Sequence, residues 1–312
     1  MNDSIVCANS IFEQPWWLDA VAPGQWSAVE IEKGGKTVAR LPYVETKRFG
    51  FRLLGMPDYT QTLGYWIDDT GAKNARKYAR NKDLVLELID KLPKGYSIDL
   101  WLDHTCDYLF PFHWNGFKLQ VAYSYRIEDI QDEKRLWEGL ADNIRREIKK
   151  AQSQLKVEDN HAIDDLILMQ NKTFLRQGRS HRGNGALLKR LDEVLKKKQA
   201  RKLLCAVDAE HRIHAASYFV YDSNCCYYLV GGGDPELRTS GAASLLMWEG
   251  MKFASTVSKA FDFEGSMIEP IERFFRAFGG TPVPYWRVTK LNMALSIADY
   301  LKPRVKRIIG WK

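Results

Sequence analysis

The sequence predicts an α+β protein built as two domains, and three observations lead to this expectation. The chain has 312 residues, of which 45% are hydrophobic and 12% aromatic, enough for two compact cores. Segments with strand-like alternation and segments with helical apolar stripes occur together in both halves of the chain. In the second half, consecutive strand-like runs lead through a glycine-bearing loop into a helix.

The first half mixes both kinds of element. A helix is expected to begin near Pro15, because proline is favoured in the first turn of a helix. The other expected elements are strands with a Gly34-Gly35 turn over 26–55, a helix over 79–92, and strands over 95–103 and 117–128.

The second half repeats this mixture in a clearer order. Helices are predicted over 132–155, 162–176 and 185–200, and strands over 202–209, 212–222 and 224–231. After the loop we expect a helix over about 241–255, a strand over 259–266, a helix over 270–277, a strand over 285–290 and a last helix over 291–302. This order predicts an α+β sheet whose fourth strand leads into a helix through a polar loop.

Positive charge is concentrated in two zones. The net charge is +7, while residues 172–202 carry +9 and the last eleven residues carry +5, which leaves −7 for the remainder. Two basic zones on an acidic body suggest a polyanionic partner. The alternative is that Lys196, Lys197 and Lys198 form only the solvated face of a helix.

Other features of the sequence exclude several classes of protein. Five cysteines without a Cys-x-x-Cys spacing argue against a disulfide framework and a zinc site, and they suit a reducing cytosol. The six histidines are scattered, so we expect no metal. No apolar run approaches the roughly 20 residues that span a bilayer, and the N-terminus lacks a signal-peptide pattern. We therefore expect a cytoplasmic protein.

The loop after the aromatic strand resembles a known phosphate-binding motif. Arg238-Thr239-Ser240-Gly241-Ala242-Ala243 fits the (Gln/Arg)-x-x-Gly-x-(Gly/Ala) loop of GNAT acyltransferases, which binds the pyrophosphate of acyl-CoA. The physics of a helix start agrees, because its first NH groups have no partner within the helix and lie at the positive end of the helix dipole. Arg238 adds a bidentate phosphate donor. The alternative is a plain helix start that is capped by Ser240.

A second resemblance covers about half of the chain. The segments FDFEGSMIEPIERFFRAFGG (261–280) and NIRREIKKAQSQLKV (143–157) are similar to motifs of the Fem peptidyltransferase family, whose members contain two GNAT-like modules. The resemblance implies tandem GNAT-like modules, each a mostly antiparallel mixed sheet flanked by helices. We expect a degenerate N-terminal module over 1–126 and a C-terminal module over 127–312 that carries the donor site and a basic tail.

The resemblance also implies a reaction and a place for it. An acyl or aminoacyl group passes from a thioester or a tRNA ester to an amine or hydroxyl. In GNAT enzymes the fourth strand separates from the fifth, and its backbone NH polarises the donor carbonyl; here this place corresponds to Leu229, Val230 and Gly231. We expect the glycines 231–233 to let the chain bend away there.

The general base is expected on the next strand. Alternation places Asp262 and Glu264 on one face, where two carboxylates raise each other's pKa, as suits a base near neutral pH. Glu264 is the preferred base, while Asp262 equally suits a structural partner for an arginine. Tyr285 is a candidate general acid, as are Tyr227 and Tyr228, although aromatic residues in strands more often belong to the core.

Two further segments suggest partners. The loop 176–185 presents Arg179 and Arg182 to an anionic acceptor or to donor phosphates, or else is a solvated connection. The tail KPRVKRIIGWK combines positive charge with Ile308, Ile309 and Trp311, which suits a lipid headgroup surface at the inner face of the membrane; the alternative is a disordered or packed tail.

Three functions follow from the sequence. The first is a GNAT-type transferase that uses acyl-CoA, such as acetyl-CoA, on an amine or hydroxyl of an envelope or polysaccharide precursor. The second is a Fem-type transferase that uses charged tRNA on a lipid-linked precursor, with residues 172–202 as the RNA contact. The third is a binding protein that kept the fold without the chemistry. The loop at Arg238–Ala243 favours the first.

Overall fold

The chain forms two compact units. The computed structural model describes residues 7–48, 51–176, 178, 185–265 and 267–292. Unit 1 comprises 1–122 and 285–312, and unit 2 comprises 123–284. The division expected from the sequence placed everything after residue 126 in the second domain, whereas the chain returns to unit 1 at Tyr285.

Unit 1 contains a mostly antiparallel sheet. Its strand order is β1-β2-β3-β5-β12, with β4 paired to β2, and the β3/β5 pair is parallel. The strands are β1 (Trp26–Lys33), β2 (Lys36–Arg48), β3 (Phe51–Gly55), β4 (Trp66–Ile67), β5 (Ser97–Leu102) and β12 (Thr281–Lys290). The helical segments are η1 (Ile11–Glu13), α1 (Pro15–Val21), α2 (Asn74–Lys91) and α3 (Phe110–Trp114).

Helix α2 covers the sheet of unit 1 with the predicted apolar stripe. Leu84, Val85, Leu88 and Ile89 are buried at helical spacing and join the core that strands β1, β2 and β5 contribute to. Val288 of β12 is fully buried in the same core. The last strand of the chain is therefore an integral part of the first unit.

Unit 2 contains a second mostly antiparallel sheet, of order β6-β11-β10-β9-β8-β7, in which β10 and β11 are parallel. The strands are β6 (Lys118–Glu128, in this unit from Tyr123), β7 (Lys156–Glu158), β8 (Arg201–Val207), β9 (Ile213–Tyr221), β10 (Cys225–Gly233) and β11 (Ala260–Asp262). The helical segments are α4 (Glu133–Gly139), α5 (Asp142–Gln152), α6 (Ile163–Arg176), α7 (Gly185–Lys198), η2 (Arg238–Ser240), α8 (Ala242–Val257) and α9 (Glu269–Arg276).

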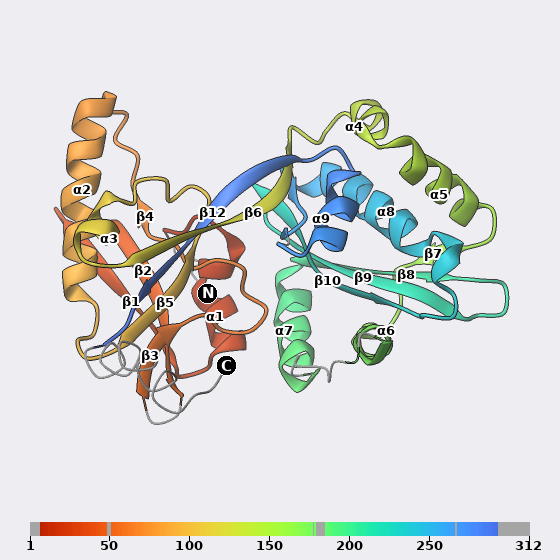
Figure 1. Ribbon diagram of the computed structural model, residues 1–312, viewed down its shortest axis with the longest axis horizontal. Coiled ribbons are helices and arrows are strands. Elements are labelled where there is room, and N and C mark those ends of the chain that lie inside the picture. The colour runs from red at the N-terminus through yellow and green to blue at the C-terminus, as the bar shows by residue number, and fades with distance from the viewer. Residues whose placement is uncertain (1–6, 49–50, 177, 179–184, 266, 293–312) are drawn as a thin grey trace, which may run out of the picture. The chain divides into compact units, whose positions relative to one another are not determined.

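Helices cover both faces of this second sheet. Figure 1 shows α4, α5, α8 and α9 on one side of β8–β10 and α6 and α7 on the other. The core between α8 and the sheet is rich in aromatic residues, among them the fully buried Phe219, Phe261, Phe263 and Phe278. Gly250 of α8 lies against the Phe219 ring, so the helix approaches the sheet closely.

The two units repeat one order of elements. In unit 1, the antiparallel strands β1, β2 and β3 precede helix α2 and strand β5, which is parallel to β3. In unit 2, the antiparallel strands β8, β9 and β10 precede helix α8 and strand β11, which is parallel to β10. The strand that follows each of these repeats in sequence pairs with the other repeat. Strand β6 follows β5 but pairs with β11, and β12 follows β11 but pairs with β5.

The predicted fold class is confirmed, with differences in detail. Both sheets are mostly antiparallel and flanked by helices. The strand expected over 259–266 ends at Asp262, because Glu264 and Gly265 take positive φ. The helix expected over 291–302 and the basic tail lie almost wholly outside the described residues. Within the described ranges, no helix has the length and apolar character that crossing a membrane requires.

Candidate functional site

Strands β10 and β11 separate within the sheet of unit 2. They pair over three positions, Cys225–Tyr227 against Ala260–Asp262. Strand β10 then continues to Gly233 with β9 as its partner, through an irregularity between Tyr228 and Val230. Among the described residues, no ladder pair joins β10 to β11 beyond Asp262. The separation therefore begins after Tyr227, and Leu229, Val230 and Gly231 lie in the separated part of β10. Their role in binding stays a prediction.

The glycines of β10 serve a different purpose from the expected bend. Gly231, Gly232 and Gly233 remain paired with β9 and have no positive φ. A Cβ at Gly231 would overlap the Tyr228 hydroxyl, and one at Gly232 would overlap the backbone of α6 at Met169 and Gln170. These glycines allow close approach of neighbouring groups to the strand.

The loop before α8 is a 3-10 turn that ends in a left-handed glycine. Residues Arg238–Ser240 form η2, and Gly241 has φ +79° immediately before the helix begins at Ala242. A Cβ at Gly241 would lie 2.6 Å from the carbonyl oxygen of Glu147 in α5. Both the φ angle and this contact require glycine. The Ser240 hydroxyl accepts a long hydrogen bond from Ala242 N at 3.4 Å, but the N-cap position of α8 is Gly241, so Ser240 is not the helix cap.

Helix α5 holds this loop from behind. Lys150 Nζ donates to the carbonyl of Thr239 at 2.8 Å, and Gln154 Nε2 donates to the carbonyl of Ser240 at 3.2 Å. These two contacts fix the backbone immediately before the first amides of α8. Ser244 Oγ also bonds Glu147 Oε2 at 2.6 Å.

The outward side of the same loop is open. Arg238, Thr239 and Ala243 are exposed. Within the described ranges, the Arg238 guanidinium has neither an ion pair nor a side-chain hydrogen bond. A free guanidinium beside the positive end of a 16-residue helix is an arrangement that favours an anion.

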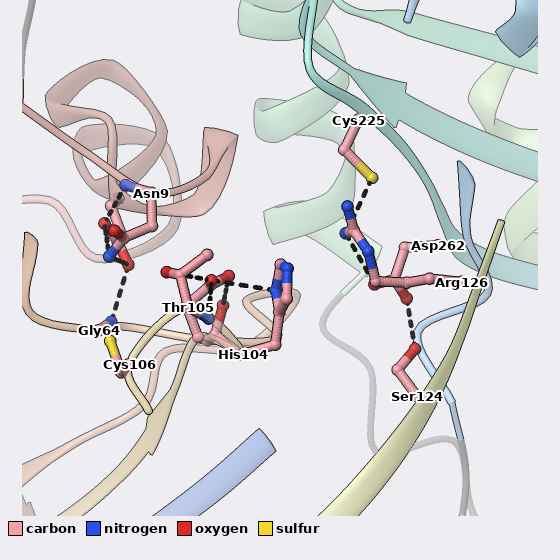
Figure 2. A network of polar contacts seen from close by, with 12 residues as sticks. Asn9, Gly64, His104, Thr105, Cys106, Ser124, Arg126, Cys225 and Asp262 are labelled. Atoms are coloured by element: carbon pink, nitrogen blue, oxygen red, sulfur yellow. Dashed lines mark hydrogen bonds and ion pairs between the residues drawn. The ribbon is translucent and has the colours of Figure 1, made fainter. Parts of the chain in front are cut away.

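Asp262 is held by three donors at the end of β11. Arg126 Nη1 lies 3.2 Å from its Oδ2, while Ser124 Oγ and the backbone N of Glu264 donate to its Oδ1 (Figure 2). Arg126 also donates to Cys225 Sγ at 3.3 Å. Burial raises the pKa of Asp262, and the Arg126 guanidinium opposes the rise. The fully bonded carboxylate corresponds to the structural role that the sequence left open for Asp262.

Glu264 differs from Asp262, because one of its carboxyl oxygens accepts no hydrogen bond from the described residues. It has φ +56°, and its Oε1 is buried without a hydrogen-bond partner among the described residues. Burial raises the pKa of Glu264 well above its ordinary value, and the charge of Asp262 raises it further. A buried carboxyl oxygen without a hydrogen-bond partner lowers the stability of the folded protein. Glu264 is therefore a strong functional candidate.

Tyr228 lies on β10 at the point where the strand leaves β11, and its hydroxyl bonds the Ser217 side chain. The same hydroxyl lies over Gly231. Burial raises the pKa of Tyr228 to about 12, and the nearby charge of Glu264 contributes to the rise. The ring packs between Phe219 and Phe275, with centroids 5.7 and 5.9 Å away. The hydroxyl therefore stays protonated at neutral pH beside the carboxyl.

Helix α6 brings polar groups that the sequence analysis missed. The Thr173 hydroxyl accepts a hydrogen bond from the backbone NH of Gly233 at 2.9 Å, and Lys172 forms an ion pair with Asp234. Gln170 is buried, and its Oε1 has no partner among the described residues. A signal was present, because Gln170 occupies a core position in the apolar stripe Ile163, Leu166, Gln170.

The remaining predicted site residues fall elsewhere. Tyr285 belongs to unit 1, where its ring packs against Trp101 with centroids 5.2 Å apart. Arg179 and Arg182 lie outside the described residues. In the described ranges, no group of three or more His, Cys, Asp or Glu side chains is arranged to hold a metal ion.

Ion pairs lower the net charge of the basic zone 172–202, which has eleven basic residues. Five of its cations contact a carboxylate: Lys172 with Asp234, Lys189 with Asp164, Lys196 and Arg201 with Asp192, and Lys202 with Asp159. Three of these four aspartates lie outside the zone, so its count of charges overstates the local potential. The three outside aspartates reduce the charge of +9 but leave the zone basic.

A pocket of about 740 Å³ with both polar and apolar walls includes a residue that contacts the loop. Its walls are residues 152–156, 158, 207–212 and 214, and it shares Gln154 with the contact behind the loop. His214 is buried there, with Nε2 2.9 Å from Asp208 Oδ2, and its Nδ1 has no partner among the described residues. The pocket thus provides space and hydrogen-bonding groups next to the start of α8.

Comparisons with known proteins agree with this geometry. The sequence model of a family described as "Acetyltransferase (GNAT) domain" matches residues 140–265, which include the loop, β10 and β11. No curated protein matches the chain.

Solved structures resemble the chain at low sequence identity. The crystal structure of FemX has a TM-score of 0.67 at 13% identity, covering 88% of this chain and 91% of that one. The C-terminal domain of a putative lysylphosphatidylglycerol synthetase from Agrobacterium fabrum has a TM-score of 0.56 at 11% identity, covering 89% of each. A tandem GNAT protein from the clavulanic acid biosynthesis pathway has a TM-score of 0.50 at 11% identity, covering 86% and 83%. These likenesses concern the fold.

Proposed function

We propose that the protein is an acyltransferase that moves an acyl group from acyl-CoA to an amine or hydroxyl of an envelope or polysaccharide precursor. The match of residues 140–265 to the sequence model of a GNAT acetyltransferase domain is the premise. One observation carries the proposal. Strand β10 leaves β11 after Tyr227, and the loop that follows β10 starts α8 with a left-handed Gly241 and with Arg238, which has no ion pair among the described residues. The unpaired part of β10 and the proposed anion site for the diphosphate then belong to one continuous segment.

The diphosphate of the donor is proposed to bind at the start of α8. Its oxygens would accept hydrogen bonds from the first amides of the helix and from the Arg238 guanidinium. Thr239, Ser240, Gly241, Ala242 and Ala243 form the backbone that it approaches. Because Lys150 and Gln154 hold the loop carbonyls, the amides are fixed before the donor arrives.

The thioester is proposed to lie along Leu229, Val230 and Gly231, where β10 has no partner on the β11 side. The acceptor nitrogen or oxygen attacks the thioester carbon, and backbone NH groups there stabilise the oxyanion. Glu264 accepts the proton of the attacking group. The carbon–sulfur bond then breaks, and the thiolate takes a proton from the Tyr228 hydroxyl, which regains one from Glu264.

Asp262 is proposed as a positioning residue. It accepts a hydrogen bond from Glu264 N at 2.8 Å and is itself fixed by Arg126. No step is assigned to Tyr285, which packs on Trp101 in unit 1. Arg179 and Arg182 remain proposed contacts for an anionic acceptor. We place the protein in the cytoplasm at the inner face of the membrane, with the basic tail as a peripheral contact.

A Fem-type transfer from charged tRNA to a lipid-linked precursor is the second candidate. The similarity in fold to FemX and to a lysylphosphatidylglycerol synthetase domain favours it. The ion pairs within 172–202 lower the charge available for the RNA contact that it needs there. We therefore place it behind transfer from acyl-CoA.

Calorimetric titration with acetyl-CoA tests the donor site. We expect saturable binding, weakened about tenfold or more in Arg238→Ala, because one charge-assisted hydrogen bond is worth roughly 1.5–3 kcal/mol. Arg273→Ala removes an exposed arginine on α9 as a matched control and should bind like the wild type. Gly241→Trp, which brings a side chain against Glu147, should abolish binding.

The outcomes separate the three functions. Absence of acetyl-CoA binding together with salt-sensitive binding of charged tRNA would replace the first candidate by the second. Binding of acetyl-CoA without release of free CoA thiol, over a panel of amine and hydroxyl acceptors, would favour a protein that binds without catalysis. Release that depends on Glu264 would support transfer.

A further inference from the structure

Unit 1 exposes a ladder of aromatic rings on α2, α3 and the turn between β5 and α3. Tyr78 stacks on Tyr108 at 5.3 Å between centroids, Tyr108 contacts Phe110 at 5.4 Å, and Phe110 contacts Trp114 at 5.8 Å. Phe110 is 58% exposed and Trp114 is 56% exposed. These are contiguous large apolar side chains, unlike the scattered single ones that are normal on protein surfaces.

The ladder stands on a rigid base. Phe112, between the two exposed rings in sequence, is fully buried and packs edge-on against Phe117 at 5.2 Å. The Tyr65 hydroxyl donates to the carbonyl of Tyr108 at 3.1 Å and accepts from its NH at 3.2 Å. Helix α3 thus has apolar side chains on both its buried and its exposed side. Phe110 and Trp114 on the exposed side belong to no core within the described ranges.

Positive charge adjoins the ladder on α2. Residues 73–82 (KNARKYARNK) contain five basic residues and no acid, and Tyr78 lies among them. Arg80 pairs with Asp68 and Lys82 with Asp83. Lys73, Arg76 and Lys77 are exposed and have no ion pair among the described residues. Asp107 is the one acid within 104–114.

These cations lie at the wrong end of the helix for stability. The start of α2 is the positive end of its dipole, where acidic residues stabilise and basic ones destabilise. The first turn of α2 has no acidic residue, and Lys73 is the residue before the helix. These basic residues lower the stability of α2 in the free protein. Binding to a polyanion would explain why they are found there.

We propose that the Tyr78–Tyr108–Phe110–Trp114 ladder and the start of α2 form a docking surface for an anionic lipid bilayer. Phe110 and Trp114 enter the interface between headgroups and acyl chains, where aromatic residues are favoured. Lys73 and Lys77, four positions apart, remain at the level of the lipid phosphates. This surface is distinct from the basic tail and is independent of the nature of the acyl donor.

A bilayer fits the surface better than a nucleic acid does. Bases bind proteins by stacking on the open faces of aromatic rings. Here the rings lie against one another along the ladder, so their faces are partly covered and their edges are presented. Edges suit insertion among lipids, which makes no demand on ring faces.

Sedimentation of the full-length protein with vesicles tests this surface. We expect binding to vesicles of phosphatidylcholine with phosphatidylglycerol, weakening with added salt, and little binding to phosphatidylcholine alone. The double variant Phe110→Ser/Trp114→Ser should bind about tenfold more weakly, and Lys73→Gln/Lys77→Gln should lose a similar factor together with part of the salt sensitivity.

Matched controls separate the surface from general effects. Leu168→Ser/Leu175→Ser removes two exposed apolar side chains from α6, and Lys134→Gln/Lys149→Gln removes two exposed cations from α4 and α5; both should bind like the wild type. Thermal midpoints should stay unchanged, because the replaced rings are exposed. Equal vesicle binding by the wild type and Phe110→Ser/Trp114→Ser would overturn the proposal. So would tRNA binding that requires these rings while vesicles are ignored.

Discussion

Arg126 Nη1 lies 3.2 Å from Asp262 Oδ2, and both side chains are buried. The pair joins β6 to β11 at the place where β11 ends. Because the other oxygen of Asp262 accepts the NH of Glu264, the ion pair also fixes the turn that carries the proposed base. The Arg126–Asp262 pair therefore stabilises the end of β11 and also positions the proposed base Glu264.

Replacing Arg126 should destabilise the protein strongly. In Arg126→Met the Asp262 carboxylate loses its counter-ion in a buried site, and we expect the free energy of unfolding to fall by about 3–5 kcal/mol. Denaturant titration measures this. Lys134→Met breaks an exposed pair with Glu138 at 3.8 Å and should change stability by less than about 1 kcal/mol. Equal effects of the two replacements would contradict the role given to Arg126.

Replacing Glu264 should raise stability while lowering activity. The folded-state pKa of Glu264 is raised well above the unfolded value, so the folded protein binds more protons between the two, and this group's contribution to stability falls as pH rises through that window. Glu264→Gln removes this fall in stability at high pH. The thermal midpoint of the variant should therefore exceed that of the wild type at pH 8 but not at pH 4. Turnover should fall roughly 10²–10⁴-fold.

The pH profile of the rate gives a second readout for Glu264. A base must be ionised, so kcat should rise with pH through the raised pKa of Glu264 in the wild type, and this limb should be absent in Glu264→Gln. The control Glu269→Gln, on the exposed first turn of α9, should leave both the midpoint and the rate unchanged. A wild-type rate in Glu264→Gln would refute the assignment.

Glu13 should give unit 1 a pH-dependent stability. Its carboxylate accepts hydrogen bonds from Asn9 N at 2.7 Å and Gly64 N at 2.8 Å; Figure 2 labels both donor residues. Burial raises the pKa of Glu13 to about 7, and Asp103 adds to the rise. From pH 4.5 to about 7 the folded state binds more protons, so this contribution falls as pH rises, by up to about 1.4 kcal/mol per unit. Unfolding free energies of Glu13→Gln at several pH values should lack this slope; an unchanged slope would contradict it.

Two neighbouring glycines of β10 should respond differently to alanine. In Gly232→Ala the methyl group would overlap the α6 backbone at Met169 and Gln170, and helix or strand has to move. In Gly233→Ala the nearest atom is the carbonyl oxygen of His214 at 3.2 Å, which a small shift relieves. We expect Gly232→Ala to lower the unfolding free energy by about 1–3 kcal/mol more than Gly233→Ala. Equal losses would show that α6 does not constrain this strand.

The sequence predicted the parts of the site that local chemistry determines. The aromatic strand, the loop with Gly241 and the following helix each have a signal within a few residues, and the separation near Leu229 followed from the resemblance to GNAT enzymes. The α+β class and the GNAT and Fem-like resemblance are confirmed.

Contacts between distant residues were beyond the same reasoning. Arg126 and Asp262 are 136 positions apart, and nothing near either residue indicates the other. Alternation assumed that the strand of Asp262 continues, whereas Glu264 turns out of it with a positive φ. The charge count of 172–202 ignored aspartates such as Asp159 and Asp234, which only the fold brings to its lysines.

The exchange of β6 and β12 also determines when each unit becomes complete during synthesis. Every residue of unit 2 has been synthesised once Pro284 is joined to the chain. Unit 1 still lacks β12, whose Val288 fills its core and whose backbone pairs with β5. Domains usually complete in order from the N-terminus, but here the unit that begins first is finished last. A chain that ended at Pro284 would therefore contain every residue of the second unit, while β5 of the first unit would lack its partner β12.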